Sequence, residues 1–403
     1  MLILSFILAI VLGVAAGTLT GLFPGIHVNL VAVFLLSASS YLLQYTSMIS
    51  LVIFIVAMSL THSFLDFIPS IFLGAPNEDS FLSILPGHEL LKKGHGYEAV
   101  ILTLYGSLIA LPIILIFIPI FIFILPAVHE LIGSIIAFLL IFFSLYLIFR
   151  EENFLTSLTI FVLAGFLGFL TLNLPVREPL LPLLTGLFGS STLIVSLKTS
   201  PEKLTKQIIK PLKHIILPKT QIIKSTLTAS IAAPLCSFLP GIGSGHAAVI
   251  ASEISEHNGR SFLFLNGAIT TIVTALTFIT LYAINRARSG TAVVIKEILQ
   301  KITFQDLVII IMAVILSSLI SFFLGIWLAK LTAKHINKIN YRTLSIITLF
   351  ILLTVNLFFS NILGIFVLIT STALGIFAII SNSRRINLMG SLLIPTILFY
   401  LFQ

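Results

Sequence analysis

The sequence contains few charged residues and almost no cysteine. Only 9% of its 403 residues are Asp, Glu, Lys or Arg, whereas about a quarter of the residues in a soluble domain are charged. The single cysteine, Cys236, excludes an intramolecular disulfide. With 58% hydrophobic residues, a soluble fold would lack the polar surface needed to cover its core. The composition therefore excludes soluble enzymes, nucleic-acid binders, secreted disulfide scaffolds and disordered chains.

Long tracts without charge indicate the fold class. No charged residue occurs from Met1 to Leu65, only Glu130 interrupts Ile101 to Phe149, and Thr343 to Ser383 is again uncharged. A bilayer span needs roughly 20 apolar residues, so each tract holds two or three crossings. The tracts are continuously apolar and do not alternate as β-barrel strands do. We expect an all-α polytopic protein of the cell membrane with about ten transmembrane helices plus broken or re-entrant ones.

Basic residues gather in short loops, the pattern that orients a chain in a membrane. Residues 198–224 hold seven lysines and one acid, and we expect them to form a cytoplasmic linker. The linker separates a first membrane repeat (1–197) from a second (225–403). A basic loop at 330–342 is predicted on the same side. The loop with Arg286 and Arg288 fits poorly, because it falls outside if each neighbouring segment crosses once.

The two halves share a Pro-Gly element that follows a face of small residues. The first reads Gly13, Gly17, Gly21 and then Phe23-Pro24-Gly25-Ile26, and the second reads Ala229, Ala233, Ser237 and then Leu239-Pro240-Gly241-Ile242. All positions align at one offset of 216 residues, from 23 to 239. Small residues every four positions let another helix backbone approach closely in lipid. Each Pro-Gly is expected to end its helix, because proline lacks an N–H and glycine tolerates unusual conformations.

Paired helix breaks point to a binding site. A helix broken at membrane depth exposes backbone groups that only protein or a watery cavity can satisfy. Breaks at matching positions of two inverted repeats are typical of secondary transporters. For either element alone, an ordinary kink or a loop at the membrane edge is the alternative. We expect residues 23–29 and 239–246 to meet near the bilayer centre.

A polar segment from Leu73 to Glu98 has no counterpart of similar length in the second half. It contains Asn77-Glu78-Asp79 and repeats the Leu-Pro-Gly element at Leu85-Pro86-Gly87. A gate, a second re-entrant loop or a solvent-exposed loop would each fit this composition.

Four motifs are distinctive in their order and spacing. They are the Pro24-Gly25-Ile26 break, Ile84-Leu85-Pro86-Gly87 leading into Lys93-Gly94-His95-Gly96, Leu183-Leu184-Thr185-Gly186-Leu187-Phe188-Gly189, and Leu239-Pro240-Gly241-Ile242-Gly243. Together they resemble the large membrane subunit of tripartite tricarboxylate transporters, the TctA-like family, especially its archaeal branch. The resemblance covers nearly the whole chain. It implies ion-coupled carboxylate uptake, inverted repeats and, in bacteria, a small membrane subunit and an extracytoplasmic binding protein as partners.

The chemistry at the breaks favours an anion independently of this resemblance. Helices that restart after Pro-Gly present unpaired N–H groups and partial positive charge. Glycines allow a ligand to reach the backbone, so an anion would need no full positive charge there. Asn29 and Ser244 would add donors, or would serve only as helix caps. The candidate substrate-binding residues are Pro24, Gly25, His27, Asn29, Pro240, Gly241, Gly243, Ser244, Gly245 and His246.

Few titratable groups lie near the breaks. His27 and His246 would hydrogen-bond the anion or carry a proton, or would be neutral rings bonded to backbone carbonyls. Asp66 ends a long apolar run, so it and His27 are candidates for ion coupling, with an interfacial position as the alternative for Asp66. Arg177 beside Glu178 is either structural or neutralises the substrate.

The sequence favours transport over catalysis. It has no P-loop and no His-Glu-x-x-His motif, and we predict no cofactor other than Na⁺ or H⁺ as coupling ion. The leading hypothesis is a secondary active transporter of a small organic anion, a carboxylate. A translocase of a lipid-linked phosphate such as polyprenyl phosphate is the alternative, and a structural or insertase-like membrane protein ranks last.

Overall fold

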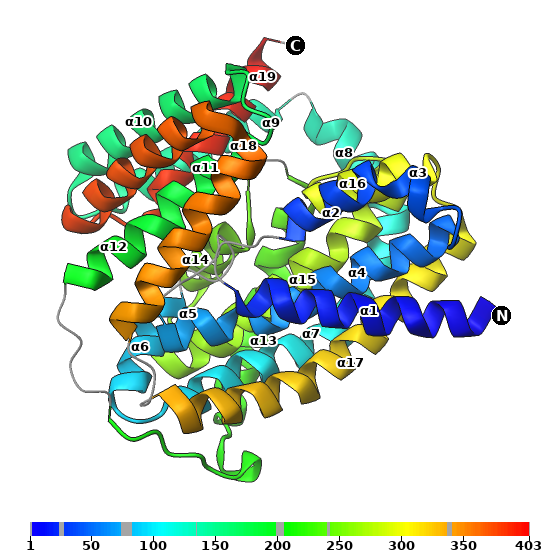
Figure 1. Ribbon diagram of the computed structural model, residues 1–403, viewed down its shortest axis with the longest axis horizontal. Coiled ribbons are helices and arrows are strands. Elements are labelled where there is room, and N and C mark those ends of the chain that lie inside the picture. The colour runs from blue at the N-terminus through cyan, green and yellow to red at the C-terminus, as the bar shows by residue number, and fades with distance from the viewer. Residues whose placement is uncertain are drawn as a thin grey trace. The chain divides into compact units, whose positions relative to one another are not determined.

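The computed structural model describes residues 2–23, 28–73, 83–133, 135–198, 205–239, 242–336 and 341–402 (Figure 1). Within these ranges every regular element is a helix. Up to the linker the helices are α1 (Leu2–Leu22), α2 (Val28–Ser37), α3 (Ser39–Leu42), α4 (Met48–Leu65), α5 (Phe67–Leu73), α6 (Ile84–Lys92), α7 (Gly96–Phe123), α8 (Leu125–Gly133), α9 (Ile136–Phe149), α10 (Phe154–Asn173), α11 (Leu180–Leu184), the π-helix η2 (Thr185–Ser190) and α12 (Ser191–Lys198). From the linker onward they are the 3₁₀ helix η3 (Leu212–His214), α13 (Lys219–Phe238), α14 (Ser244–Ile254), α15 (Gly259–Ile284), α16 (Gly290–Leu299), α17 (Phe304–His335), α18 (Tyr341–Ile380), the 3₁₀ helix η5 (Arg385–Met389) and α19 (Gly390–Leu401).

The helices confirm an all-α polytopic membrane protein. Seven helical stretches among the described residues are long and apolar enough to cross a bilayer: Ile3–Leu22, Met48–Leu73, Gly96–Phe123, Phe154–Asn173, Gly259–Ile284, Phe304–His335 and Ser345–Ile380. The bent pair α8 and α9 would make an eighth, and Leu180–Val195 and Arg385–Leu401 are shorter apolar helices. About ten crossings were predicted from the sequence, because the shorter apolar segments were taken as full spans.

The chain divides into two compact units, and each takes helices from both sides of the linker. Unit 1 holds α1 to α7 and α13 to α17, while unit 2 holds α9 to α12, α18, η5 and α19. The division between the units runs through α8. The units are therefore not the predicted halves 1–197 and 225–403, whose relation as repeats stays a prediction.

The small-residue face of α1 packs against α4 in unit 1, as the sequence predicted. A methyl group added to Gly17 would lie 2.5 Å from the Met58 carbonyl oxygen, and one added to Gly13 would lie 2.5 Å from that of Phe54. Gly21 continues the face beside His62. Residue numbers increase in the same direction along both helices at these contacts, so α1 and α4 are parallel (Figure 1).

The second half repeats this arrangement with α13 and α15. Ala229, Ala233 and Ser237 are fully buried. The Ser225 hydroxyl donates to the Ser261 carbonyl at 3.3 Å, and Thr280 donates to the Ser237 carbonyl at 3.5 Å, so these helices are also parallel. The helix positions follow the predicted offset, since α1 ends at 22 and α13 at 238.

The two parallel pairs run in opposite directions within unit 1. Helix α17 is parallel to α4, because Ser321 bonds Thr61 and Gly325 lies against Leu65. Gly325 also lies against Leu104, while residues 310–315 of α17 share a pocket with residues 111–115 of α7, so α17 is antiparallel to α7. Helix α7 is parallel to α15, with Gly106 against the Ala268 backbone. Opposite directions of α4 and α15 are those expected of inverted repeats.

The second part of the linker is packed onto unit 1. The Gln207 amide accepts from the Gly96 N–H at 2.8 Å and donates to the Leu91 carbonyl at 3.0 Å. Lys210 pairs with the buried Glu98 carboxylate at 2.8 Å, and Arg260 pairs with its other oxygen at 2.7 Å. One carboxylate thus joins α7, the linker and the start of α15.

Unit 2 pairs its helices across the two halves. In α10, a methyl on Gly168 would overlap the Ser391 carbonyl at the start of α19. In α18, Gly375 lies against the Leu187 carbonyl of η2, and Thr372 shares a hydroxyl hydrogen bond of 2.6 Å with Ser190. The Leu183–Gly189 motif thus provides the surface on which α18 packs. Helix α18 itself is two helices that meet at Asn361, where φ is 63°.

Candidate functional site

The first predicted break lies at the end of α1. Helix α1 ends at Leu22 and α2 begins at Val28, while Pro24, Gly25 and His27 fall outside the described residues. Asn29 is in the first turn of α2. Helix α1 therefore ends two residues before Pro24, close to the predicted helix end.

The second break turns the chain back on itself. Helix α13 ends at Phe238, α14 begins at Ser244, and Pro240 and Gly241 fall outside the described residues. Three residues after α14, the His257 ring contacts the Ser225 and Thr228 hydroxyls near the beginning of α13, both at 3.3 Å. Helices α13 and α14 therefore form an antiparallel hairpin, which a simple kink would not give.

His246 covers the beginning of α14. Its Nδ1 accepts a hydrogen bond of 3.1 Å from the N–H of Gly243, the extended residue that caps the helix. A neutral ring that accepts at Nδ1 carries its proton on Nε2. That Nε2 is buried without a partner in the described structure, and the residue is 3% exposed. The alternative for His246, a ring bonded to a backbone carbonyl, is not what is found. Ser244 and Gly245 are buried beside it.

Arg288 brings a positive charge to this hairpin. It lies in the loop between α15 and α16, and its charge acts on both Cys236 before the break and His246 after it. Arg288 is not among the residues predicted from the sequence, which favoured an anion site without a full positive charge. One feature of the sequence could have pointed to Arg288. Its loop is basic, yet simple counting of membrane crossings places the loop outside, where basic residues are not expected.

Asn29 connects the first break to the same loop. Its side-chain oxygen accepts from the Thr291 N–H at 3.2 Å, in the first turn of α16. A methyl group on Gly290 would lie 2.8 Å from the Asn29 Cβ, so only glycine allows this approach. Gly290 and Thr291 therefore contact a residue in the first turn of the helix after the first break.

Asp66 is buried at the junction of α4 and α5. It is 1% exposed and lies inside the Met48–Leu73 stretch. One turn earlier, His62 bonds the Thr20 hydroxyl at 3.1 Å, next to the end of α1. Gly21, next to the end of α1, lies against Leu65, so Asp66 is close to the end of that helix.

Other candidate positions lie elsewhere. Arg177 is exposed in unit 2, between α10 and α11, and burial raises the pKa of the neighbouring Glu178. Residues 74–82 of the polar segment fall outside the described residues, and the segment continues as α6 and the start of α7. Among the residues that the structure describes, no three His, Cys, Asp or Glu side chains form a metal cluster.

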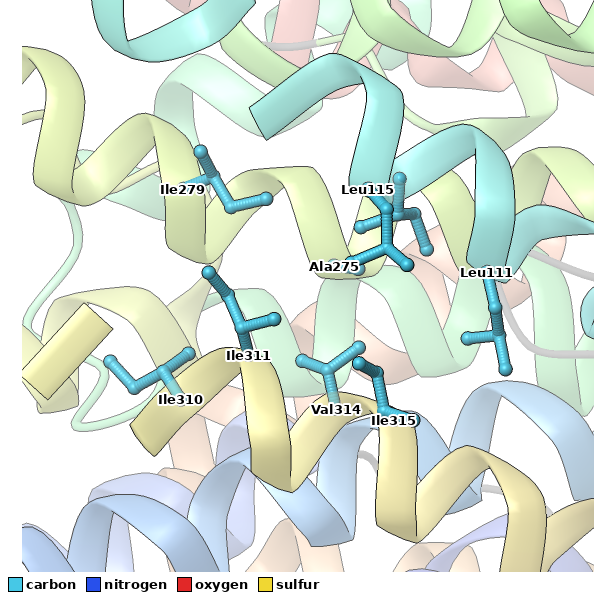
Figure 2. Close-up of a pocket in the computed structure, with 9 residues that line it drawn as sticks. Leu111, Leu115, Ala275, Ile279, Ile310, Ile311, Val314 and Ile315 are labelled. Atoms are coloured by element: carbon cyan, nitrogen blue, oxygen red, sulfur yellow. The ribbon is translucent and has the colours of Figure 1, made fainter. Parts of the chain in front are cut away.

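An apolar pocket lies between α7, α15 and α17 of unit 1. Figure 2 shows the aliphatic side chains that surround it, among them Leu111, Ala275, Ile279 and Val314. No polar side chain lines it, so it has no group for an anion.

The fold and the site define a multi-pass helical membrane protein with interrupted helices, a half-buried arginine and a buried histidine. The chain belongs to the tripartite tricarboxylate transporter TctA family, whose model matches residues 7–390. It is thus of the tricarboxylate-transporter type, and in tripartite systems such a protein works with a small membrane subunit and a periplasmic binding protein. It is 32% identical over 397 residues to uncharacterized protein MJ1079 of Methanocaldococcus jannaschii. This alignment covers 95% of the present chain and 96% of the relative. No solved structure gives a significant match.

Proposed function

We propose that this protein is a secondary active transporter in the cell membrane that carries a small carboxylate, coupled to Na⁺ or H⁺. The carboxylate binds at the beginnings of α2 and α14, the two helices of unit 1 that follow the Pro-Gly elements. Two observations carry the proposal. The Asn29–Thr291 hydrogen bond joins α2 to the loop that holds Arg288, and the Nε2 of His246 at the beginning of α14 is buried without a partner among the described residues.

Three groups suit an anion beside the second break. The first turn of α14 offers backbone N–H groups and the positive end of the helix dipole. The Nε2–H of His246 is a buried donor without a partner in the described structure, and such a donor costs free energy until a ligand accepts from it. Arg288 adds a full charge, which a substrate with several carboxylates requires more than a monocarboxylate does.

Coupling requires a group that exchanges an ion. Asp66, buried near the first break, would exchange a proton, and His27 is the second candidate. Na⁺ instead requires oxygen ligands, and α15 offers the Asn266 amide and the Thr270 hydroxyl one turn apart on one face. Both are at most 1% exposed and have no hydrogen-bond partner among the described residues.

The test is uptake of labelled citrate and smaller carboxylates by proteoliposomes, with Na⁺ and pH gradients imposed separately. Arg288→Gln should lower uptake about 10- to 100-fold, because it removes a charged hydrogen bond to the substrate. The exposed Arg286, two residues earlier, provides a matched control, and Arg286→Gln should transport normally. Equal uptake by the two variants would contradict the role of Arg288.

A second arm tests the backbone site. Gly25→Val and Gly241→Val should abolish uptake while the protein still inserts, because the added bulk blocks ligand approach to the amides. Normal uptake in both would exclude the breaks as the binding site. If no carboxylate is taken up but a polyprenyl phosphate crosses the bilayer in these liposomes, the alternative translocase function replaces the proposal.

Partners are part of the proposal. A small membrane subunit and an extracytoplasmic binding protein would deliver the carboxylate, as in the tripartite systems. Uptake by the purified chain alone would show that it transports without them.

A further inference from the structure

Unit 2 contains a half-buried arginine outside the proposed carboxylate site. Arg385 is the first residue of η5, between α18 and α19. Its Nη2 donates to the Thr192 hydroxyl oxygen of α12. Its Nη1 atom is buried and has no hydrogen-bond partner among the described residues. Within the described part of the chain, the guanidinium therefore uses one of its two terminal nitrogens.

No acid in the described part of unit 2 compensates this charge. Glu151 is bound by Arg384 at 3.7 Å and by the Asn387 amide at 3.1 Å. Glu152 is exposed to solvent. Glu130 and Glu178 lie at the other end of the unit, since the full lengths of α9 and α10 separate them from Glu151.

The surroundings of Arg385 favour an anion from outside the protein. Burial lowers the pKa of Arg385 to about 10 from its ordinary 12.5, so the group still carries its charge at neutral pH. A buried cation without an anion is strongly unfavourable, whereas arginine pairs well with phosphate oxygens. An oxyanion at Nη1 would remove this cost.

The position of Arg385 indicates which oxyanion reaches it. Thr192 lies six residues before Lys198, so Arg385 is at the linker end of the unit. The start of α10 is at the same end, because the Ser157 and Ser383 hydroxyls are 3.1 Å apart. Apolar side chains there face outward, with Leu155 71% and Ile380 72% exposed, as expected for a surface in lipid.

We propose that Arg385 binds the phosphate of an anionic lipid headgroup at the linker end of unit 2. Basic pockets between helices on the cytoplasmic side are suited to such headgroups. Thr192 is a positioning residue: its hydroxyl donates to the Phe188 carbonyl at 2.6 Å, so its oxygen is fixed to accept from Nη2 and leave Nη1 for the phosphate. This site does not depend on the proposed carboxylate transport.

The test is the thermal unfolding midpoint of the full chain in delipidated detergent micelles. Phosphatidylglycerol should raise the midpoint by several degrees, while diacylglycerol, which has no phosphate, should not. The rise should disappear in Arg385→Gln and return in part in Arg385→Lys. Arg384→Gln is the matched control, because the neighbouring Arg384 is 49% exposed and should leave the rise intact.

Several outcomes would overturn the proposal. An equal phosphatidylglycerol effect in wild type and Arg385→Gln would remove Arg385 from the site. An Arg385-dependent rise with millimolar inorganic phosphate alone would identify a site for a free anion and exclude the lipid as its source. If Arg385→Gln does not fold, native mass spectrometry of Thr192→Val decides, and undiminished retention of phosphatidylglycerol would contradict the proposal.

Discussion

At the residue scale, Asp66 is the acid whose surroundings differ most from water. A carboxyl group that is 1% exposed inside an apolar stretch is expensive to keep charged, and such groups are commonly functional. Its neighbour one turn away, His62, contacts the end of α1. Asp66 therefore lies one turn after a residue that contacts the end of α1.

We expect Asp66→Asn to change the dependence of uptake on pH or Na⁺, because the variant can neither release a proton nor neutralise a cation. The measurement is proteoliposome uptake under each gradient separately, with His27→Gln as a second variant. Asp306→Asn, which removes a cap at the start of α17, is the control. Unchanged ion dependence in both Asp66→Asn and His27→Gln would place coupling elsewhere.

The half-buried position of His88 predicts how the stability of the folded protein depends on pH. Burial, together with the charge of Lys92, lowers the pKa of His88 to about 4 from 6.5. Below pH 6.5 the unfolded chain therefore binds a proton that the folded chain does not. His88 should lower stability progressively as the pH falls from 6.5 to about 4, with no effect above this range.

His88→Gln should therefore lose less stability than wild type between pH 6.5 and 4 in thermal unfolding measured in detergent. The exposed His214 is the matched control, and His214→Gln should follow the wild-type curve. Parallel curves for wild type and His88→Gln would show that His88 is protonated in the folded protein.

At the scale of elements, close helix contacts in unit 1 depend on glycine. The Cβ of an alanine at position 17 would lie 2.5 Å from the Met58 carbonyl oxygen, so α1 and α4 must separate. At Gly189 of η2, an added methyl would meet only ordinary contacts of 3.8 Å or more. The same substitution thus has opposite consequences at the two positions.

Gly17→Ala should destabilise the protein by about 1–3 kcal/mol, the usual cost of overpacking. Gly189→Ala should be neutral or slightly stabilising, since alanine favours a helix by about 1 kcal/mol over glycine. Thermal or chemical unfolding of the two variants checks the difference. Equal stabilities would mean that α1 moves away from α4 without cost.

At the scale of the whole molecule, the linker joins two halves of the sequence, 1–197 and 225–403, whose helices are mixed within each compact unit. Both units take helices from each half, and Glu98 joins α7, Lys210 of the linker and α15. The halves therefore cannot fold as separate bodies in the way that two sequential domains would.

The basic linker is predicted to be cytoplasmic, with the two halves in opposite orientation. Lys213→Cys should be labelled by a membrane-impermeant thiol reagent only from the cytoplasmic side. The native Cys236 is buried and provides a low background. Lys203→Cys tests a second position, and labelling of both only from outside would reverse the topology.

The sequence by itself determined the features that are local. Uncharged apolar tracts identify spans because the bilayer excludes charge, Pro-Gly ends a helix through its own backbone chemistry, and glycines four residues apart form one face. The four motifs likewise lie in short segments, so the family resemblance was recognisable without coordinates. The end of α13 at Phe238 and the packing of Gly17 on α4 confirm such predictions.

Only the tertiary structure decided which distant residues meet. Asn29 caps a helix that begins 261 residues later, at Gly290. Arg288 lies in a loop whose charge indicated only membrane orientation, and Arg385 follows an ordinary apolar helix. The burial of Asp66, the charge beside His246 and the uncompensated guanidinium all depend on which helices pack together. Helix packing in lipid is decided by the fit of whole surfaces, and this fit is not encoded in the spacing of residues along any one segment.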